Sequence, residues 1–189
     1  MEYVFRGQDQ DNNVAGGFSK WSETGTPGPV SDFKSIGNVS DANFIGWGTW
    51  VAGQREYLGT VMLNHVHYIA GRPTSSTEIA ALRSASASAT YTLAGNTAPI
   101  KGGVAGTLTA ASLTVNFSSV NYVVNASFTT SFAPGTPITE TITVTTTSAT
   151  FSGSDIRGAL IGTKAGLAGL TYAKDLGSGL ITGAAVFQK

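Results

Sequence analysis

The chain has no cysteine among its 189 residues. This absence excludes disulfide bonds, thiolate metal sites and cysteine nucleophiles. Charged residues are scarce too, at 12% of the chain, well under the usual quarter for a soluble domain. The 11 basic and 11 acidic residues give a formal net charge of zero. Such a balance provides no electrostatic attraction for nucleic acid or an anionic membrane, and we expect no nucleic-acid partner.

Long apolar runs are missing as well. Every apolar stretch is too short to cross a bilayer as a helix, so we expect no transmembrane helix. The N-terminal sequence MEYVFRGQDQDNN has no basic segment followed by an apolar run, and we expect no signal peptide there. The same N-terminus is compatible with a start codon placed before a piece of a longer exported protein.

Sequence patterns that support catalysis are also lacking. There is no G-x-S-x-G motif around a nucleophilic serine, and the carboxylates Glu140 and Asp155 stand isolated in the sequence. The glycines from Gly158 to Gly169 precede no helix and no Lys-Ser/Thr pair, so they predict no phosphate-binding loop. Their expected role is to let a coiled hairpin bend in a narrow barrel. We therefore expect no enzyme activity and no cofactor.

Alternation of apolar and polar residues is the main positive signal. Residues 121–132 place Tyr122, Val124 and Phe128 on one face and Asn125 and Thr129 on the other. Residues 112–118 and 137–151 repeat the pattern with Thr, Ser and Asn as the polar partners. This period of two predicts strands with one face buried and the other in water.

Further strands are expected at 44–52, 60–70, 90–94, 158–163 and 180–187. Residues 75–85 predict a short helix, because Ser75 or Ser76 can cap it and Glu78 suits its first turn. Tight Gly and Pro turns favour antiparallel meander connections. The predicted fold is all-β: an up-and-down antiparallel barrel of about eight strands over 41–189, with one short helix and an irregular N-terminal arm over 1–40.

Several of these segments occur in an order typical of one family. A WGTW strand is followed by HVHYIAGRPT, a short helix, a TYTLAG strand, alternating strands and a glycine-rich closing hairpin that ends in GAAVF. Residues 44–189 resemble the small β-barrel of the transferrin-binding protein B group of bacterial surface lipoproteins. Similar barrels occur at the C-terminal ends of exported proteins that resemble FecR-type regulators. The motifs YIAGRPT and GAAVF carry most of the resemblance.

The resemblance implies the barrel fold and a location in the bacterial cell envelope, at the outer-membrane surface or outside the cell. It does not imply a lipid anchor, because the chain has no lipobox cysteine. It also implies no particular ligand, since nothing in the chain matches the transferrin-contacting loops of that family.

His65 and His67 are the sharpest candidates for chemistry. Residues two apart on a strand point the same way, so both imidazoles could reach one metal ion. No carboxylate and no third histidine follows at a suitable spacing, and a two-histidine site without a carboxylate binds metal poorly. We therefore expect no metal, and we expect these histidines to form hydrogen bonds in or beside the barrel.

Aromatic residues provide the remaining candidates for ligand binding. Trp47, or Trp21 with Phe18, could form an exposed patch, because aromatic side chains are enriched at interfaces; the alternative is that they pack in the core. Asp9 and Asp11 resemble a calcium-binding loop faintly, but the glycine at its sixth position and the closing glutamate are missing. A solvated loop is the favoured interpretation there.

Three hypotheses of function remain. The first is a non-enzymatic module of the cell envelope or a secreted protein, which binds a protein or cell-surface partner or has a structural role. The second is a lipocalin-like carrier of a small apolar ligand, which requires an empty barrel. The third is a metal-dependent enzyme built on His65 and His67. The first fits the absence of a catalytic set best.

Overall fold

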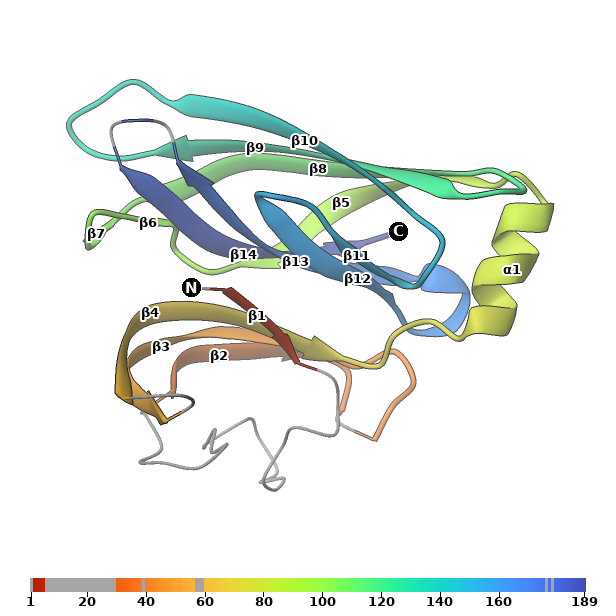
Figure 1. Cartoon of the computed structure of the whole chain (residues 1–189), viewed down its shortest axis with the longest axis horizontal. Helices are drawn as coiled ribbons and strands as arrows, with labels where there is room; N and C mark the ends of the chain where they lie inside the picture. The colour runs from red at the N-terminus through yellow and green to blue at the C-terminus, as the bar shows by residue number, and fades with distance from the viewer. Residues whose placement is uncertain (1, 6–29, 39, 57–59, 176, 178) are drawn as a thin grey trace.

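The computed structural model of the protein describes residues 2–5, 30–38, 40–56, 60–175, 177 and 179–189. Its strands form two sheets, which lie one above the other in Figure 1. The larger sheet curls into a nearly closed antiparallel barrel, and the smaller, N-terminal sheet packs against the outside of that barrel.

Eight strands in a single path form the wall of the barrel. In spatial order they run β10-β9-β8-β5-β14-β13-β12-β11. Their bounds along the chain are β5 (Ser88–Asn96), β8 (Thr107–Phe117), β9 (Tyr122–Ser131), β10 (Ile138–Thr146), β11 (Thr150–Ser152), β12 (Ile156–Ile161), β13 (Leu167–Asp175) and β14 (Leu180–Gln188). The pair β5 and β14 joins the first and last of these eight strands. Every other pair of neighbours in the wall is consecutive among the eight strands along the chain, so the predicted up-and-down barrel is confirmed.

Short elements complete this part of the chain. A small hairpin of β6 (Ile100–Lys101) and β7 (Val104–Ala105) is inserted between β5 and β8 and pairs with β14. The helix α1 (Ser76–Ser84) lies at one end of the barrel, near the 3-10 turn η1 (Thr163–Ala165). The helix was predicted over 75–85, and the 3-10 turn falls in the segment expected to form the glycine-rich hairpin.

The helix begins as its sequence predicts. Ser75 is the N-cap: its hydroxyl oxygen accepts a hydrogen bond from the backbone N–H of Glu78 at 3.3 Å, and its O–H donates to the Glu78 carboxylate at 2.8 Å. The first of these bonds satisfies a backbone N–H that the helix itself leaves open, and the second holds the two side chains in place. Ile79 points into the barrel core and is 2% exposed. The helix therefore covers this end of the core.

The smaller sheet has the order β1-β4-β3-β2. Its strands are β1 (Glu2–Phe5), β2 (Val30–Ile36), β3 (Ile45–Glu56) and β4 (Thr60–Gly71). β1 pairs with β4 in parallel, and the other pairs are antiparallel. The strands expected at 44–52 and 60–70 exist, but their assignment to the barrel is wrong. Alternation of side chains predicts a strand without specifying the sheet that it joins.

Two other differences concern the C-terminal half of the barrel. The segment expected as one strand over 137–151 is divided into β10 and β11 by a turn. The segment 167–175, which was expected to belong to the glycine-rich hairpin, forms the full strand β13. The division of the chain into parts 1–40 and 41–189 stays a prediction, although β1 and β2 show that the first part supplies strands to the smaller sheet.

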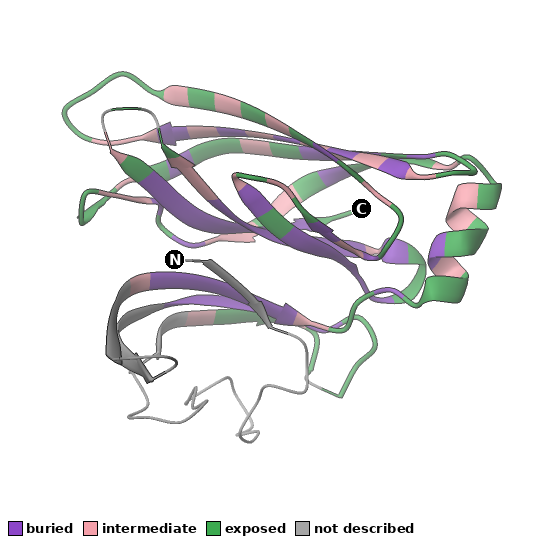
Figure 2. Cartoon of the chain, viewed as in Figure 1, coloured by how far each residue is buried: buried purple, intermediate pink, exposed green. Residues whose placement is uncertain are grey.

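β12, β13 and β14 are buried on both faces. Their inward side chains, such as Leu160, Leu170 and Phe187, join the barrel core. Their outward side chains, such as Ala159, Leu167, Ala184 and Val186, form a second cluster with residues of β3 and β4. Figure 2 shows this as nearly continuous purple along the three strands, whereas β8 to β10 alternate in colour. The core therefore has two layers that share one wall.

Candidate functional site

His67 lies in the junction between the two sheets. It belongs to β4, opposite Thr49 of β3, and it is 1% exposed. Its Nδ1 atom is 3.2 Å from the Thr49 hydroxyl and 2.9 Å from the hydroxyl of Thr97, which follows β5. The Thr97 hydroxyl oxygen also accepts a hydrogen bond from the backbone N–H of Ala184 at 2.9 Å. A short polar chain thus links the smaller sheet to β14.

The environment of His67 favours the neutral imidazole. The pKa of His67 is lowered from 6.5 to about 4, chiefly by burial and to a smaller extent by nearby positive charge, including that of His65. No other described side chain hydrogen-bonds to its Nε2 atom. Since Nδ1 is engaged by two hydroxyl groups, the ring is held in place as part of the packing between the sheets, which is the hydrogen-bonding role expected for this histidine.

His65 does not share the surroundings of His67. It is half-buried, and its φ of 53° places it in the left-handed region, which interrupts the regular strand geometry. The rule that side chains two apart point the same way assumes an extended backbone at each residue. In the described part of the chain, no three His, Cys, Asp or Glu side chains come together as a possible metal site.

Trp47 is buried, so the hypothesis that it forms an exposed patch is wrong and the alternative, that it packs in the core, is correct. It is 4% exposed and belongs to the cluster between β3 and the barrel. Its ring packs over Gly95 of β5 so closely that a Cβ atom there would clash with the indole. The glycine therefore makes room for the tryptophan. Trp21 and Phe18, the other aromatic candidates, and Asp9 and Asp11 lie outside the described residues.

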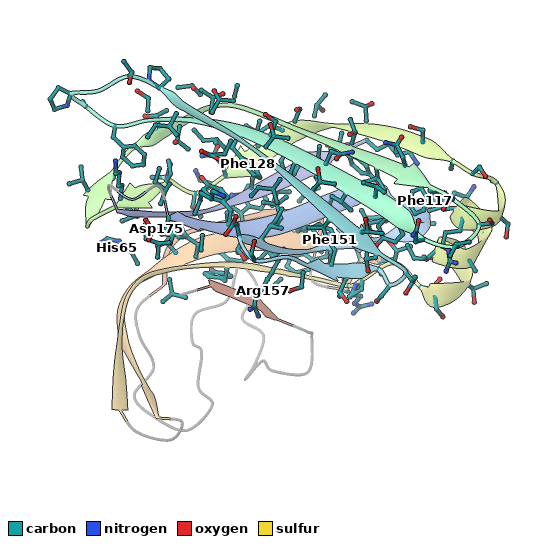
Figure 3. All side chains as sticks on the ribbon, turned by 45° about the horizontal axis from the view of Figure 1, so that its top comes forward. His65, Phe117, Phe128, Phe151, Arg157 and Asp175 are labelled. Carbon is teal, nitrogen blue, oxygen red and sulfur yellow. The ribbon has the colours of Figure 1, made fainter. Side chains whose placement is uncertain are left out.

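The barrel interior is occupied by protein side chains. All eight strands contribute inward residues to one hydrophobic cluster. Phe128 and Tyr172 stack across it with ring centroids 4.8 Å apart, and Phe117 and Tyr122 meet at the same distance. Phe117 and Phe128 are labelled in Figure 3, along the length of this core. This packing leaves the surface and the strand edges as the places where a partner can bind.

Among the described strands, the barrel wall is interrupted between β10 and β11. These strands are consecutive in the chain and are tied at their turn, where the Thr146 hydroxyl donates to the Thr150 carbonyl at 3.2 Å. Close packing of Gly153 against Val144 extends this closure by a few residues. From Ile142 back to Ile138, the only described strand paired with β10 is β9. We call this edge of β10, with Asp155 and Lys174 beyond it, the open seam.

Charged side chains gather at the open seam. Asp155, in the turn before β12, forms an ion pair of 2.8 Å with Lys174 near the end of β13. This contact is the main cause that raises the pKa of Lys174, and the charge of Glu140 on β10 adds to it. Glu140 and Asp155 look isolated in the sequence, yet the fold places both where their charges act on Lys174. One sequence signal could have pointed to this site: Glu140 stands at an inward position of β10, between Ile138 and Ile142, where an apolar residue is expected.

None of the helices in the described part of the chain is long and apolar enough to cross a membrane. Comparison of the sequence with family models and with curated proteins, and of the structure with solved structures, finds no match in any of the three.

Proposed function

We propose that the protein is a non-enzymatic module of the bacterial cell envelope, at the outer-membrane surface or secreted, which binds a protein or cell-surface partner or has a structural role. The observation that carries this proposal is the filled barrel. Inward side chains of all eight strands pack into one cluster, so the fold offers its surface and edges for contact with a partner. A packed interior of this kind suits a rigid support.

The proposed location depends on composition and resemblance. Apart from Val123, the outward residues of β9 and β10 are Thr, Ser and Asn, and none of them is charged. The order of motifs resembles the barrels of bacterial surface lipoproteins. A surface whose polarity comes from hydroxyl and amide groups has no strong field of one sign. This favours contacts by hydrogen bonding and shape over attraction of nucleic acid.

The two alternative functions have less support. A lipocalin-like carrier needs internal space, and the stacked rings of Phe128 and Tyr172 occupy the middle of the barrel. A metal-dependent enzyme on His65 and His67 needs both imidazoles free to bind one ion. His67 is instead buried, with its Nδ1 atom against two threonine hydroxyls.

Two measurements on the purified protein test the proposal. Organic extraction followed by mass spectrometry should recover no apolar compound in stoichiometric amount. A panel of ester, glycoside and peptide substrates should be turned over at the background rate, in the wild type and in His65→Ala alike. A stoichiometric ligand would establish the carrier, and turnover that His65→Ala removes would establish an enzyme.

A further inference from the structure

The edge of β10 at the open seam has the backbone groups needed to pair with another strand. β9 pairs with β10 along its whole length on one side. On the other side, between Ile138 and Ile142, no described segment forms a ladder with it. An edge strand presents N–H and C=O groups in a row, and these can pair with an extended chain. The seam therefore offers a template for one added strand.

The inward side chains of β10 show that the barrel is incompletely covered here. Ile138, Glu140 and Ile142 are all half-buried. Their partners on the same face of β9 are Thr130, Phe128 and Ala126, which are 4% exposed or less. The two strands are neighbours in one sheet, so the greater exposure on β10 arises from the missing neighbour on its far side.

Glu140 determines which strand can enter. It lies between Ile138 and Ile142 on the inward face, and no ion pair within the described residues neutralises it. The nearby cation Lys174 is already bound to Asp155. An added strand would bury the Glu140 carboxylate further, and burying an unpaired charge is costly. A strand that carries its own cation at this position avoids that cost.

A second copy of the chain does not meet this requirement with the same edge. The β10 sequence ITETITVTT has no lysine or arginine, so edge-to-edge pairing would bring an unneutralised Glu140 from each copy into the junction. Inward-pointing charges on edge strands are a known way to prevent such self-association. Glu140 therefore disfavours a homodimer at this edge while it favours a basic partner.

We propose that the edge of β10 from Ile138 to Ile142 binds an extended segment of a protein partner as an added strand, with a lysine or arginine facing Glu140. Residues two positions to either side of this cation are β-branched or aliphatic and pack beside Ile138 and Ile142. Backbone pairing supplies affinity and the alternate side chains supply specificity. This inference rests on the proposed function as a binding module and names the class of partner.

Synthetic peptides test the proposal on the full chain. The probes are two seven-residue peptides, TVTKTVT and TVTETVT, titrated into isotope-labelled protein and followed by amide NMR shifts. We expect the lysine peptide to shift amides of 138–142 and of Asp155 and Lys174, with the glutamate peptide binding about fivefold more weakly. Absence of shifts at 138–142 with both peptides at millimolar concentration overturns the proposal.

A pair of variants separates a specific pairing from general attraction. Glu140→Gln removes one negative charge from the inward face, and Thr141→Lys adds one positive charge on the exposed outward face, so both change the net charge by the same amount. Glu140→Gln should abolish the preference for the lysine peptide, and Thr141→Lys should retain it. Equal preference in the wild type and Glu140→Gln contradicts the role of Glu140.

Light scattering after size-exclusion chromatography measures the oligomeric state and so tests whether a second copy of the chain binds the edge of β10. The wild type should be monomeric, and Glu140→Ile should self-associate. A wild-type dimer whose interface maps to 138–142 assigns the edge to a second copy and overturns the proposal. If the peptides fail to bind, the proposal for the edge of β10 is wrong but the proposed function of a non-enzymatic module with a filled barrel still holds. If the protein carries an apolar ligand or turns over a substrate, the proposed function is wrong, and the peptide experiment still decides whether the edge of β10 binds a strand.

Discussion

The two halves of the barrel wall have the same strand geometry but differ in what covers their outer faces. β9 and β10 alternate along their length, and β8 alternates from Ser112 to Phe117, with mostly threonine, serine and asparagine on the outside. β12 to β14 are rich in glycine and alanine and are buried on both faces, because the smaller sheet covers them. Alternation of apolar and polar residues thus indicates a strand with one face in water, and its loss indicates a strand packed between two layers. Substitutions on the outer face of β12 to β14 should therefore change the free energy of unfolding more than substitutions on the outer face of β9 and β10.

The largest difference is expected for a charge on the outer face. Ala184→Lys on β14 places an ammonium group in the cluster with β3 and β4, where Ala184 is fully buried. We expect a loss of about 4 kcal/mol in the free energy of unfolding, because the charge has no partner there. Thr145→Lys on the exposed face of β10 is the matched control. Equal urea midpoints for the two variants would contradict the comparison.

A smaller effect is expected from added volume. A Cβ atom on Gly169 of β13 would approach the Cδ1 atoms of Ile45 at 2.6 Å and Ile69 at 2.9 Å. Gly169→Val should therefore destabilise the protein by about 3 kcal/mol through overpacking against the smaller sheet. Ser127→Val, on the outer face of β9, should change stability little. Thermal unfolding of both variants measures the difference, and an equally large loss in Ser127→Val would show that the outer face of β9 is also packed.

Acid should weaken the covered side through His67. The folded protein holds the pKa of His67 at about 4, below the usual 6.5. As the pH falls below 6.5, the unfolded chain takes up a proton that the folded chain excludes, so stability decreases. Between about pH 7 and about pH 5 the loss should be about 2 kcal/mol. Urea unfolding of the wild type and His67→Gln checks this, since the variant should lack that part of the slope; equal slopes would rule the contribution out.

The smallest effect is expected where hydroxyl groups face water. The Thr129 and Thr139 hydroxyls lie 2.9 Å apart on neighbouring strands of the exposed wall. Replacing both with valine preserves the β-branched shape and removes one solvent-exposed hydrogen bond. Stability should stay within about 0.5 kcal/mol of the wild type. A loss of several times this size, measured by urea unfolding, would show that the threonine ladder stabilises the sheet directly.

The strands and the helix were largely predictable, because their signals are local. Alternation over 121–132 identifies β9, and Ser75 with Glu78 identifies the start of α1. The sheet assignment of β3 and β4 was not predictable. A strand with one face on a second layer has the same pattern as a strand of the barrel, and the parallel pairing of β1 with β4 joins distant parts of the chain.

The candidate sites show the same limit. Trp47 packs over Gly95, and His67 is hydrogen-bonded to Thr97; each contact joins the smaller sheet to a distant part of the barrel chain. Nothing near Trp47 in the sequence separates an exposed aromatic from one that packs over a distant glycine. Likewise, Glu140, Asp155 and Lys174 come from three separate segments. Only the register of the closed wall brings them to one seam.

The pairing of β5 with β14 has a consequence for the order of folding. The first barrel strand joins the last, so the ring of strands closes only after residues near Gln188 have been synthesised. β3 and β4 are made much earlier, yet the wall that they pack against consists of β12 to β14. Such contacts between distant residues slow folding. β3 and β4 can therefore pack on their wall only after the C-terminal strands have been made.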